Sequence, residues 1–376
     1  MRVSADLYPE VLGGVGLHAH LLSRDEARAG HDVVVITGKS PGDTPGVSRT
    51  KEGYRIVRVS SPITIFGNRL SLELFPTLVR WLEAADVVHL HSHLFFFSNV
   101  GSIVSRLAGR KTLLTIHGLV SQSAPSWVQS VFMETIGLLT IKTVSRIVCL
   151  SAHDMEELVR MGINRGRLIV IPEGVDCSFF QPSETRGDTR GGSVVLLSVG
   201  RLVPGKGFEN LLRGFALALK EIPRMTLTIR GDGPLLPSLR KLAATLNVED
   251  AVTFRGRVGM SELVGLYQNA DVFVLTSFAE GVPKSILEAM ACGLPVICSN
   301  LPQFEDLVAD CGVSVDPSDA KSISRGIVEL AKSPERRAEL RLKCRDRVAA
   351  GYDWNEVSRR NTAVLEELAA LPGGGS

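Results

Sequence analysis

The chain alternates short apolar runs with amphipathic stretches over most of its length. Five runs in the first half lack the polar alternation of a half-exposed strand and lie at residues 33–36, 87–88, 113–116, 147–150 and 168–171. Uninterrupted apolar runs of this length are typical of strands buried on both faces of a parallel sheet. Segments suited to helices fit between them, at residues 14–30, 126–143 and 152–160. This strand–helix–strand alternation predicts an α/β domain.

The pattern breaks in a polar stretch rich in Gly, Ser and Thr, which is typical of a linker. A second alternating series follows, with apolar runs at residues 194–199, 226–229, 252–254, 272–275 and 296–298. We therefore expect two α/β domains that face each other and bind ligands at the carboxyl ends of their strands. The predicted boundaries are 1–175 for the N-terminal domain, 176–192 for the linker, 193–352 for the C-terminal domain and 353–371 for a closing helix.

Composition and charge narrow the function classes. Hydrophobic residues make up 44% and charged residues 22% of the 376 residues, which is typical of a globular protein and not of a disordered one. The formal net charge of +2 is too small to indicate a nucleic-acid partner. The six cysteines form no C-x-x-C pair, which favours buried, reduced thiols. No signal peptide opens the chain and no apolar run reaches about 18 residues, so we expect a cytoplasmic protein.

The strongest chemical signal is the segment at residues 278–289, which follows the predicted strand at 272–275. Pro283 suits a first helical turn, because its missing N–H costs nothing there. A helix that begins at this point leaves free backbone N–H groups near Lys284 and Ser285. Such groups, at the positive end of a helix, bind phosphate well. The segment therefore predicts a phosphate site at the start of a helix.

Four charged side chains extend this predicted site. Glu280 lies in the loop before the helix, where its carboxylate can bind sugar hydroxyls. Glu288 falls on the second helical turn, and a carboxylate there can accept both hydroxyl protons of a ribose. Arg201 and Lys206 belong to a glycine-containing loop at residues 200–207, after the first strand of the second series. Two cations suit a diphosphate, which carries about two negative charges.

These motifs resemble those of family 4 of the glycosyltransferases. Residues 280–288 look like the E-x7-E motif of the family, and residues 200–207 resemble its G-R-L-x-x-x-K-G loop, whose Arg and Lys bind the donor diphosphate. Residues 231–234 resemble its G-x-G-P turn beside the nucleotide. In the first half, residues 13–15 resemble the N-terminal glycine loop, and residues 115–118 match the strand end whose His lies beside the transferring sugar.

Further similarity lies near the expected domain crossings. Residues 172–176 resemble the N-G-V-D segment of the family, except that Glu173 stands where the family often has Asn. Residues 352–354 are similar to the family's entry to a helix that crosses back onto the first domain. The first strand, at residues 1–4, is shorter than is usual for the family, so we expect that a few residues are missing from this end.

The resemblance implies an α/β protein of the GT-B fold, with two Rossmann-like parallel-sheet domains facing a central cleft and a C-terminal helix packed back on the N-terminal domain. It implies a retaining enzyme that moves a hexose-type sugar from a UDP-sugar, or as second choice a GDP-sugar, to a glycan, lipid-linked or small-molecule acceptor. The implied catalytic residues are His117, Glu280, Arg201 and Lys206, with His91 and His117 on the acceptor side. The implied donor-binding residues are Gly13, Gly14, Val15, Arg201, Lys206, Gly231, Gly233, Glu280, Gly281, Val282, Pro283, Lys284, Ser285, Ile286 and Glu288.

Other functions share parts of this pattern. The spacing Gly14-x-Gly16-x-x-Ala19 fits a dinucleotide fingerprint, but the next strand should end in an acidic residue and instead ends in Thr37-Gly38. A nucleotide-sugar 2-epimerase or a phosphorylase would use the same two-domain fold, and the full set of charged residues favours transfer over both. A catalytically silent sugar-nucleotide binder is a further alternative.

His89, His91 and His93 alternate along an extended segment and would share a face, so the pattern allows a metal site. A polar strand end is the simpler interpretation. The chain has no D-x-D triplet, and the diphosphate already has cationic partners. We expect neither a metal nor another cofactor.

Residues 87–153 combine five Lys and Arg side chains with a single acidic one, Glu134. They also contain an apolar helix around Trp127, Val131 and Leu138. An apolar and basic surface suits an anionic bilayer or a lipid-linked acceptor. Core packing with a few cations at its rim is the alternative. The pattern therefore allows peripheral contact with the inner face of a membrane.

Overall fold

The computed structural model describes residues 1–8, 14–39, 46–65, 67–120, 126–183 and 193–372. These residues divide into two compact units. Unit 1 comprises Met1–Pro172 together with Glu356–Ser376, and unit 2 comprises Glu173–Asn355. The last part of the chain therefore belongs to the unit that the first part builds.

The central sheet of unit 1 is mostly parallel and has eight strands among the described residues. In spatial order these are β10 (Leu168–Val170), β9 (Arg146–Cys149), β8 (Lys111–Ile116), β7 (Val87–His91), β1 (Arg2–Val3), β2 (Val34–Gly38), β4 (Arg55–Val59) and β3 (Gly46–Arg49). Strand β3 is antiparallel and lies at one edge. A hairpin of β5 (Ile63–Ile65) and β6 (Asn68–Leu70) follows β4. Strands β2 and β7 are buried along their whole length, because helices cover both faces of the sheet.

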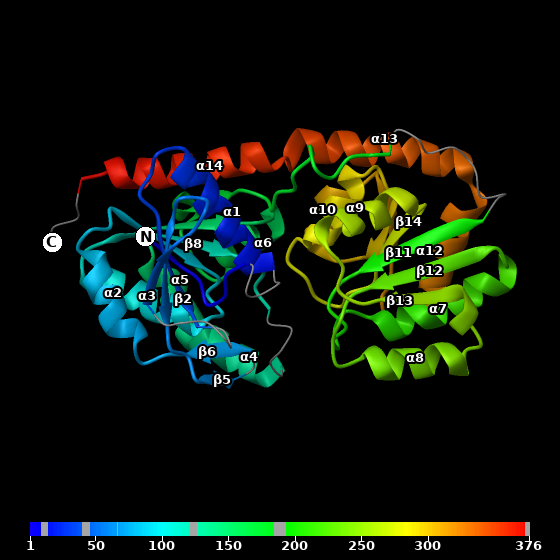
Figure 1. Cartoon of the computed structure of the whole chain (residues 1–376), viewed down its shortest axis with the longest axis horizontal. Coiled ribbons are helices and arrows are strands. Elements are labelled where there is room, and N and C mark those ends of the chain that lie inside the picture. The colour runs from blue at the N-terminus through cyan, green and yellow to red at the C-terminus, as the bar shows by residue number, and fades with distance from the viewer. Residues whose placement is uncertain (9–13, 40–45, 66, 121–125, 184–192, 373–376) are drawn as a thin grey trace. The chain divides into compact units, whose positions relative to one another are not determined.

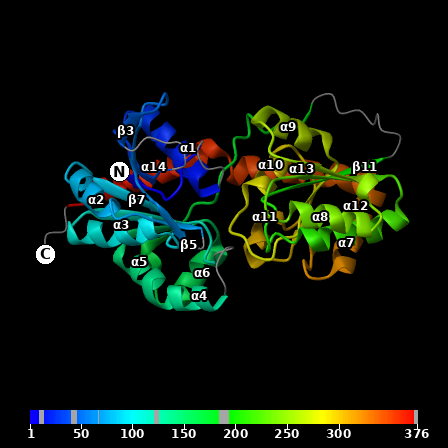
Figure 2. The same cartoon turned by 60° about the horizontal axis from the view of Figure 1, so that its bottom comes forward.

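The helices of unit 1 connect these strands. They are α1 (Gly14–Arg28), α2 (Leu74–Leu82), α3 (Phe96–Leu107), α4 (Ser126–Phe132), a π-helix (Met133–Gly137), α5 (Leu138–Thr143), α6 (Ala152–Arg160) and a short 3-10 helix (Arg165–Arg167). The final helix, α14 (Trp354–Ala370), lies beside α1 in both views (Figures 1 and 2). Arg360 on α14 donates to the carbonyl of Val170 at 2.6 Å. The predicted packing of the C-terminal helix on the N-terminal domain is thus confirmed.

Unit 2 contains an all-parallel sheet, which has six strands among the described residues. Their spatial order is β13 (Val252–Arg255), β12 (Met225–Arg230), β11 (Val194–Val199), β14 (Val272–Leu275), β15 (Val296–Ser299) and β16 (Gly312–Val315). The order reverses between β11 and β14, which is the point where open α/β sheets form a ligand crevice. The loops that follow these two strands carry the motifs of the predicted donor site.

The helices of unit 2 cover both faces of this sheet. They are α7 (Phe208–Glu221), α8 (Leu236–Thr245), α9 (Met260–Asn269), α10 (Lys284–Ala291), α11 (Glu305–Val308), α12 (Ala320–Lys332) and α13 (Pro334–Gly351), with 3-10 helices at Glu249–Ala251 and Pro302–Phe304. Figure 1 shows α7 and α8 on one side of β11 and β12, with α9 and α10 on the other. This is the doubly wound arrangement that the alternating sequence pattern predicts.

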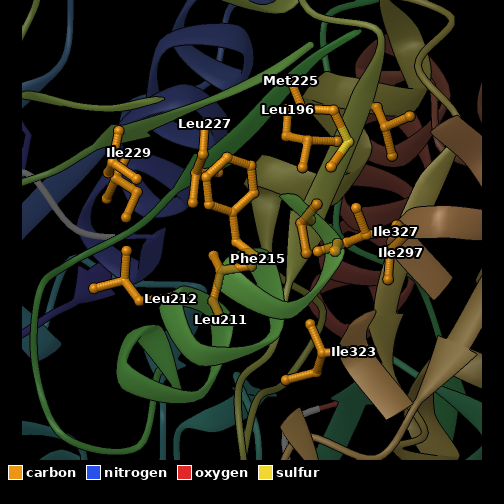
Figure 3. Packing of buried hydrophobic residues seen from close by; sticks show 14 of the residues in the cluster. Leu196, Leu211, Leu212, Phe215, Met225, Leu227, Ile229, Ile297, Ile323 and Ile327 are labelled. Atoms are coloured by element: carbon orange, nitrogen blue, oxygen red, sulfur yellow. The ribbon is translucent and has the colours of Figure 1, made fainter. Parts of the chain in front are cut away.

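The core of unit 2 fills the space between the sheet and helices α7 and α12. Leu196, Leu227 and Ile229 project from the strands, and Phe215 of α7 packs among them (Figure 3). Ile323 and its neighbours on α12 close the same cluster. Burying one such side chain stabilises the fold by about 1.5–3 kcal/mol. This layer holds β11 and α7 firmly, and the loop between them is part of the candidate site.

The predicted fold class is confirmed. The predicted strands lie within two residues of their observed bounds, except that the apolar run at residues 87–88 marks only the start of β7 (Val87–His91). One predicted helix, at residues 126–143, is interrupted by the π-helix Met133–Gly137. Among the described residues, no helix combines the length and the apolar character needed to span a bilayer. All six cysteines are buried and free, in agreement with the expected reduced thiols.

Candidate functional site

Three loops at the carboxyl ends of neighbouring strands in unit 2 pack directly on one another. Gly207 has a left-handed φ of 68°, and a Cβ atom there would lie 1.9 Å from the carbonyl oxygen of Thr276. A Cβ atom on Gly231 would lie 1.8 Å from the carbonyl oxygen of Gly200. Only glycine fits at such close approaches of two backbones. The glycines of the motifs therefore let the loops after β11, β12 and β14 form one continuous surface.

Backbone hydrogen bonds join the same loops. The N–H of Leu202 donates to Asp232 at 2.9 Å, and the N–H of Leu235 donates back to Leu202 at 3.1 Å. The N–H of Phe278 donates to Gly205 at 2.8 Å. The predicted donor residues Arg201, Gly231 and Gly233 and the segment from Glu280 to Ile286 are thus brought together at one edge of the sheet.

Lys206 and Glu280 form an ion pair within this surface. Their side chains are only 12% and 6% exposed, respectively. Gln303 donates to the backbone carbonyl of Glu280, which fixes the loop. Arg201, in contrast, is exposed. The predicted diphosphate cation and the predicted sugar-binding carboxylate are therefore direct neighbours.

Pro283 occupies the N-cap of α10 and not its first turn. Its ψ of 129° is extended, and the helix begins at Lys284. The predicted position of Pro283 was wrong by one residue, because a residue can cap a helix with extended backbone while its carbonyl already accepts an intrahelical bond. The N–H groups of the first turn, from Lys284 to Ile286, remain those that a phosphate would meet.

The side chain of Lys284 pairs with Glu173 at 2.7 Å, and these side chains are 13% and 3% exposed. The ammonium group also lies 5.3 Å from the ring centroid of Trp354. Glu173 stands where the family often has Asn, and the structure explains this departure. A buried lysine needs a partner, and Glu173 supplies the opposite charge. Lys284 thus offers its backbone N–H to the candidate site, while its side chain is engaged elsewhere.

Glu288 lies on the second turn of α10, as predicted, and its side chain is partly buried. Its Oε2 accepts a hydrogen bond from the hydroxyl of Tyr267 at 2.7 Å. Burial raises the pKa of Glu288, and the hydrogen bond from Tyr267 opposes this rise. Tyr267 was missing from the predicted site, because it is 21 residues away on another helix. No spacing pattern in one sequence points to such a contact.

A cluster of imidazoles lies at the carboxyl end of the sheet in unit 1. His91 ends β7, and its Nδ1 lies 3.2 Å from Nε2 of His117, which follows β8. The ring of His18, on α1, meets the rings of His117 and His91 at centroid distances of 5.0 and 5.8 Å. Burial, together with neighbouring His89 and Arg2, holds the pKa of His91 well below its ordinary value. His18 was not predicted.

The glycine loop before α1 is described only in part. Gly13 lies outside the described residues. Gly14 is exposed at the start of α1, and Val15 is partly buried. Their helix also carries His18, so the start of α1 and the two predicted histidines share one end of unit 1.

The three alternate histidines, His89, His91 and His93, do not gather around one point. His89 Nδ1 lies 3.1 Å from a guanidinium nitrogen of Arg2, which can only donate. His89 therefore donates through Nε2 to the hydroxyl of Thr115, at 2.8 Å. Ser92 has a φ of 63°, which breaks the strand alternation, so His93 turns away and lies 3.1 Å from the sulfur of Met133. Within the described part of the chain, no group of three or more His, Cys, Asp or Glu could hold a metal ion.

Comparison with known proteins agrees with this arrangement. Residues 12–179 match the family model described as glycosyltransferase family 4, and residues 183–347 match that of the glycosyl transferases group 1. The chain belongs to glycosyltransferase family 4. It is therefore a glycosyltransferase that transfers a sugar from a nucleotide-sugar donor, and its fold is that of the GT-B enzymes.

Individual relatives of this family 4 enzyme differ in what they glycosylate. A glycogen synthase of Mycobacterium tuberculosis is 27% identical, covering 99% of this chain and 95% of the relative. A UDP-Gal:α-D-GlcNAc-diphosphoundecaprenol α-1,3-galactosyltransferase of Escherichia coli is 28% identical over 72% of each chain. The structure of Anabaena HepE in complex with UDP and glucose has a TM-score of 0.77 and 18% identity, covering 97% of this chain and 98% of that one.

Proposed function

We propose that this glycosyltransferase transfers a hexose-type sugar from a UDP-sugar, with retention of the anomeric configuration. Two relatives favour UDP: the structurally similar HepE was solved with UDP and glucose, and the Escherichia coli relative is named for a UDP-sugar. A GDP-sugar is the second candidate. The proposal rests on one observation above all, which is the placement of Lys206, Glu280 and Glu288 around the start of α10.

The geometry of α10 supports a particular order of the donor groups. Glu288 lies four residues beyond Lys284, which is about 6 Å along the helix axis. A diphosphate on the first-turn N–H groups would place a ribose within reach of Glu288. Arg201 and Lys206 would stabilise the charge that develops on the diphosphate leaving group. Glu280 would then hold hydroxyls of the donor sugar, at the other end of the diphosphate.

Lys206 has a double role in this proposal. Without donor it neutralises Glu280, and with donor its ammonium group is shared with the diphosphate. The predicted donor residues that line this surface through their backbone are Gly231, Gly233 and the segment at residues 281–286. In unit 1, His117 would lie beside the transferring sugar, and His91 would support it from the acceptor side. In a front-face transfer, the acceptor hydroxyl attacks the anomeric carbon on the side from which the diphosphate leaves. Such a transfer retains the anomeric configuration and needs no enzymatic nucleophile.

The acceptor is a glycan, a lipid-linked sugar or a small molecule. Exposed apolar side chains favour the lipid-linked class. Trp127, Val131 and Leu139 are 71%, 58% and 51% exposed along α4 and α5. The basic residues Lys111 and Arg146 begin β8 and β9, so they lie at the opposite end of the sheet from Trp127. Contact with a membrane would therefore depend on the apolar stripe formed by Trp127, Val131 and Leu139 more than on these cations.

The turnover experiment offers UDP-glucose, UDP-galactose, UDP-N-acetylglucosamine and GDP-mannose with lipid-linked and soluble acceptors. We expect release of UDP that depends on an acceptor, and a product whose anomeric proton coupling by NMR matches that of the donor. Release of a C2-epimerised sugar without acceptor would identify an epimerase instead. Binding of a nucleotide sugar with no turnover on any acceptor would indicate a silent binder.

Membrane contact is tested separately, by cosedimentation with vesicles of phosphatidylcholine and phosphatidylglycerol. The Trp127→Ser/Val131→Ser variant should lose most of its vesicle binding, because two exposed apolar anchors are removed. A Phe75→Ser variant is a matched control, since Phe75 is a similarly exposed apolar residue, 56% exposed, on α2. Equal binding of all three proteins would exclude the stripe as the contact surface.

A further inference from the structure

The hydroxyl of Tyr267 gives Glu288 a fixed partner on a different helix. Tyr267 lies on α9 and donates to Oε2 of Glu288 at 2.7 Å. A carboxylate has about four positions at which it can accept a hydrogen bond, and the tyrosine takes one of them. The acceptor positions of Oε1 stay open for a ligand. This contact therefore sets which oxygen of Glu288 faces the candidate site.

Tyr267 is held rigidly in this position. Its side chain is fully buried. The ring lies edge-on to Phe180, with 6.0 Å between the centroids, and tilted against Phe273 of β14 at 5.9 Å. Burial, and then the carboxylate of Glu288, raises the pKa of Tyr267 well above its ordinary value. The phenol therefore stays protonated and always acts as the donor.

Two cations near Glu288 also favour its charged form, as the hydrogen bond from Tyr267 does, but neither makes a directed contact with it among the described residues. Lys284, one turn earlier on α10, and Arg230, at the end of β12, both lower the pKa of Glu288. The ammonium group of Lys284 binds Glu173, and one terminal nitrogen of the Arg230 guanidinium donates to the carbonyl of Val258 at 3.2 Å. Glu173, the ion-pair partner of Lys284, raises the pKa of Glu288. Tyr267 alone makes a directed contact with Glu288 among the described residues.

We propose that Tyr267 is a positioning residue that holds Glu288 for both hydroxyls of a ribose, and that it thereby makes the enzyme select ribonucleotide donors over 2′-deoxyribonucleotides. The inference rests on the proposed function, in which Glu288 binds the ribose. A carboxylate fixed in one orientation can accept from two adjacent hydroxyls at once. A carboxylate that is free to turn loses most of this preference, because the cost of ordering it for two hydroxyls offsets the second hydrogen bond, which the deoxyribonucleotide does not make.

The experiment compares dissociation constants of UDP and 2′-deoxy-UDP by titration calorimetry, and of GDP and 2′-deoxy-GDP in parallel. The wild type should prefer the ribonucleotide by roughly tenfold or more, because a hydrogen bond to a charged group is lost with the 2′-hydroxyl. Tyr267→Phe keeps the ring and removes only the hydroxyl. It should weaken ribonucleotide binding by about tenfold and leave the deoxyribonucleotide almost unchanged, so that the preference largely disappears.

Two controls separate positioning from a merely structural effect. Tyr352→Phe makes the same chemical change elsewhere in unit 2, at a residue that makes no contact with Glu288, and should keep the full ribose preference. In a Glu288→Gln background, adding Tyr267→Phe should have little further effect, since the two residues act as one unit. A structural role of Tyr267 would instead weaken both nucleotides equally in either background.

The outcomes are distinguishable. If Tyr267→Phe weakens ribo- and deoxyribonucleotide to the same extent, or leaves the preference intact, the positioning role is refuted while the proposed function stands. If the wild type binds neither UDP nor GDP, the proposed function itself fails and the inference falls with it.

Discussion

Replacing Lys206 by Met should have two separable effects. It should destabilise unit 2, because a nearly buried ion pair is lost, and it should abolish donor binding, because the diphosphate loses a cation. Lys206 and Glu280 are 12% and 6% exposed, so the substitution removes the cation that pairs with a nearly buried carboxylate. Breaking a fully buried ion pair costs about 3–5 kcal/mol, and the residual exposure of this pair reduces the expected cost to about 2–3 kcal/mol. For a unit of this size, that corresponds to a fall in melting temperature of about 5–10 °C.

The assay is differential scanning calorimetry of the purified variants. Lys332→Met is the matched control, because Lys332 forms an ion pair with Glu221 at 3.1 Å in the same unit, with side chains 58% and 55% exposed. An exposed pair contributes at most about 1 kcal/mol, so this control should melt close to the wild type. If Lys206→Met melts together with Lys332→Met, the reasoning about a buried pair is wrong.

A double variant then separates stability from function. In Lys206→Met/Glu280→Gln the buried carboxylate is removed together with its cation, so most of the lost stability should return. Nucleotide-sugar binding should not return, since both the diphosphate cation and the sugar-binding carboxylate are missing. Recovery of binding together with stability would show that Lys206 serves the fold alone.

Three further predictions follow from the site. Gly207→Ala should lower the free energy of unfolding by about 3 kcal/mol or more, measured by urea denaturation, because it combines a left-handed φ with a backbone clash. As the pH falls, the affinity for UDP should decrease already above the ordinary titration range of glutamate, because burial raises the pKa of Glu288 and the carboxylate is the binding form. A calorimetric pH series checks this, and Glu288→Gln should show no such decrease in affinity. The same raised pKa means that protonation of Glu288 stabilises the unliganded fold as the pH falls through this range. Sugar transfer should proceed equally with and without EDTA, since the diphosphate has protein cations as partners.

Much of the fold could be predicted because its signals are local. Buried parallel strands are continuous apolar runs, and five of them lie at residues 194–199, 226–229, 252–254, 272–275 and 296–298, each within one residue of the observed strand. Glycines that permit close loop approaches also stand out in sequence, because their motifs follow strand ends.

The rest depended on contacts between distant parts of the chain. Lys206 meets Glu280 across 74 residues, and Lys284 meets Glu173 across 111. Charge and burial together select these pairs, and burial is a property of the fold and not of a local pattern. Tyr267 was missed for the same reason, since a lone aromatic residue on an amphipathic helix predicts core packing and nothing more. Of the predicted site, Gly13 lies outside the described residues.

The central claim is that unit 2 binds a nucleoside diphosphate through the start of α10. Titration calorimetry of UDP, GDP, ADP and NAD, each with and without magnesium, tests it most directly. The account predicts micromolar binding of one nucleoside diphosphate, unchanged by chelator and strongly weakened in Glu288→Ala. Binding of NAD alone, or binding that Glu288→Ala leaves intact, would contradict it.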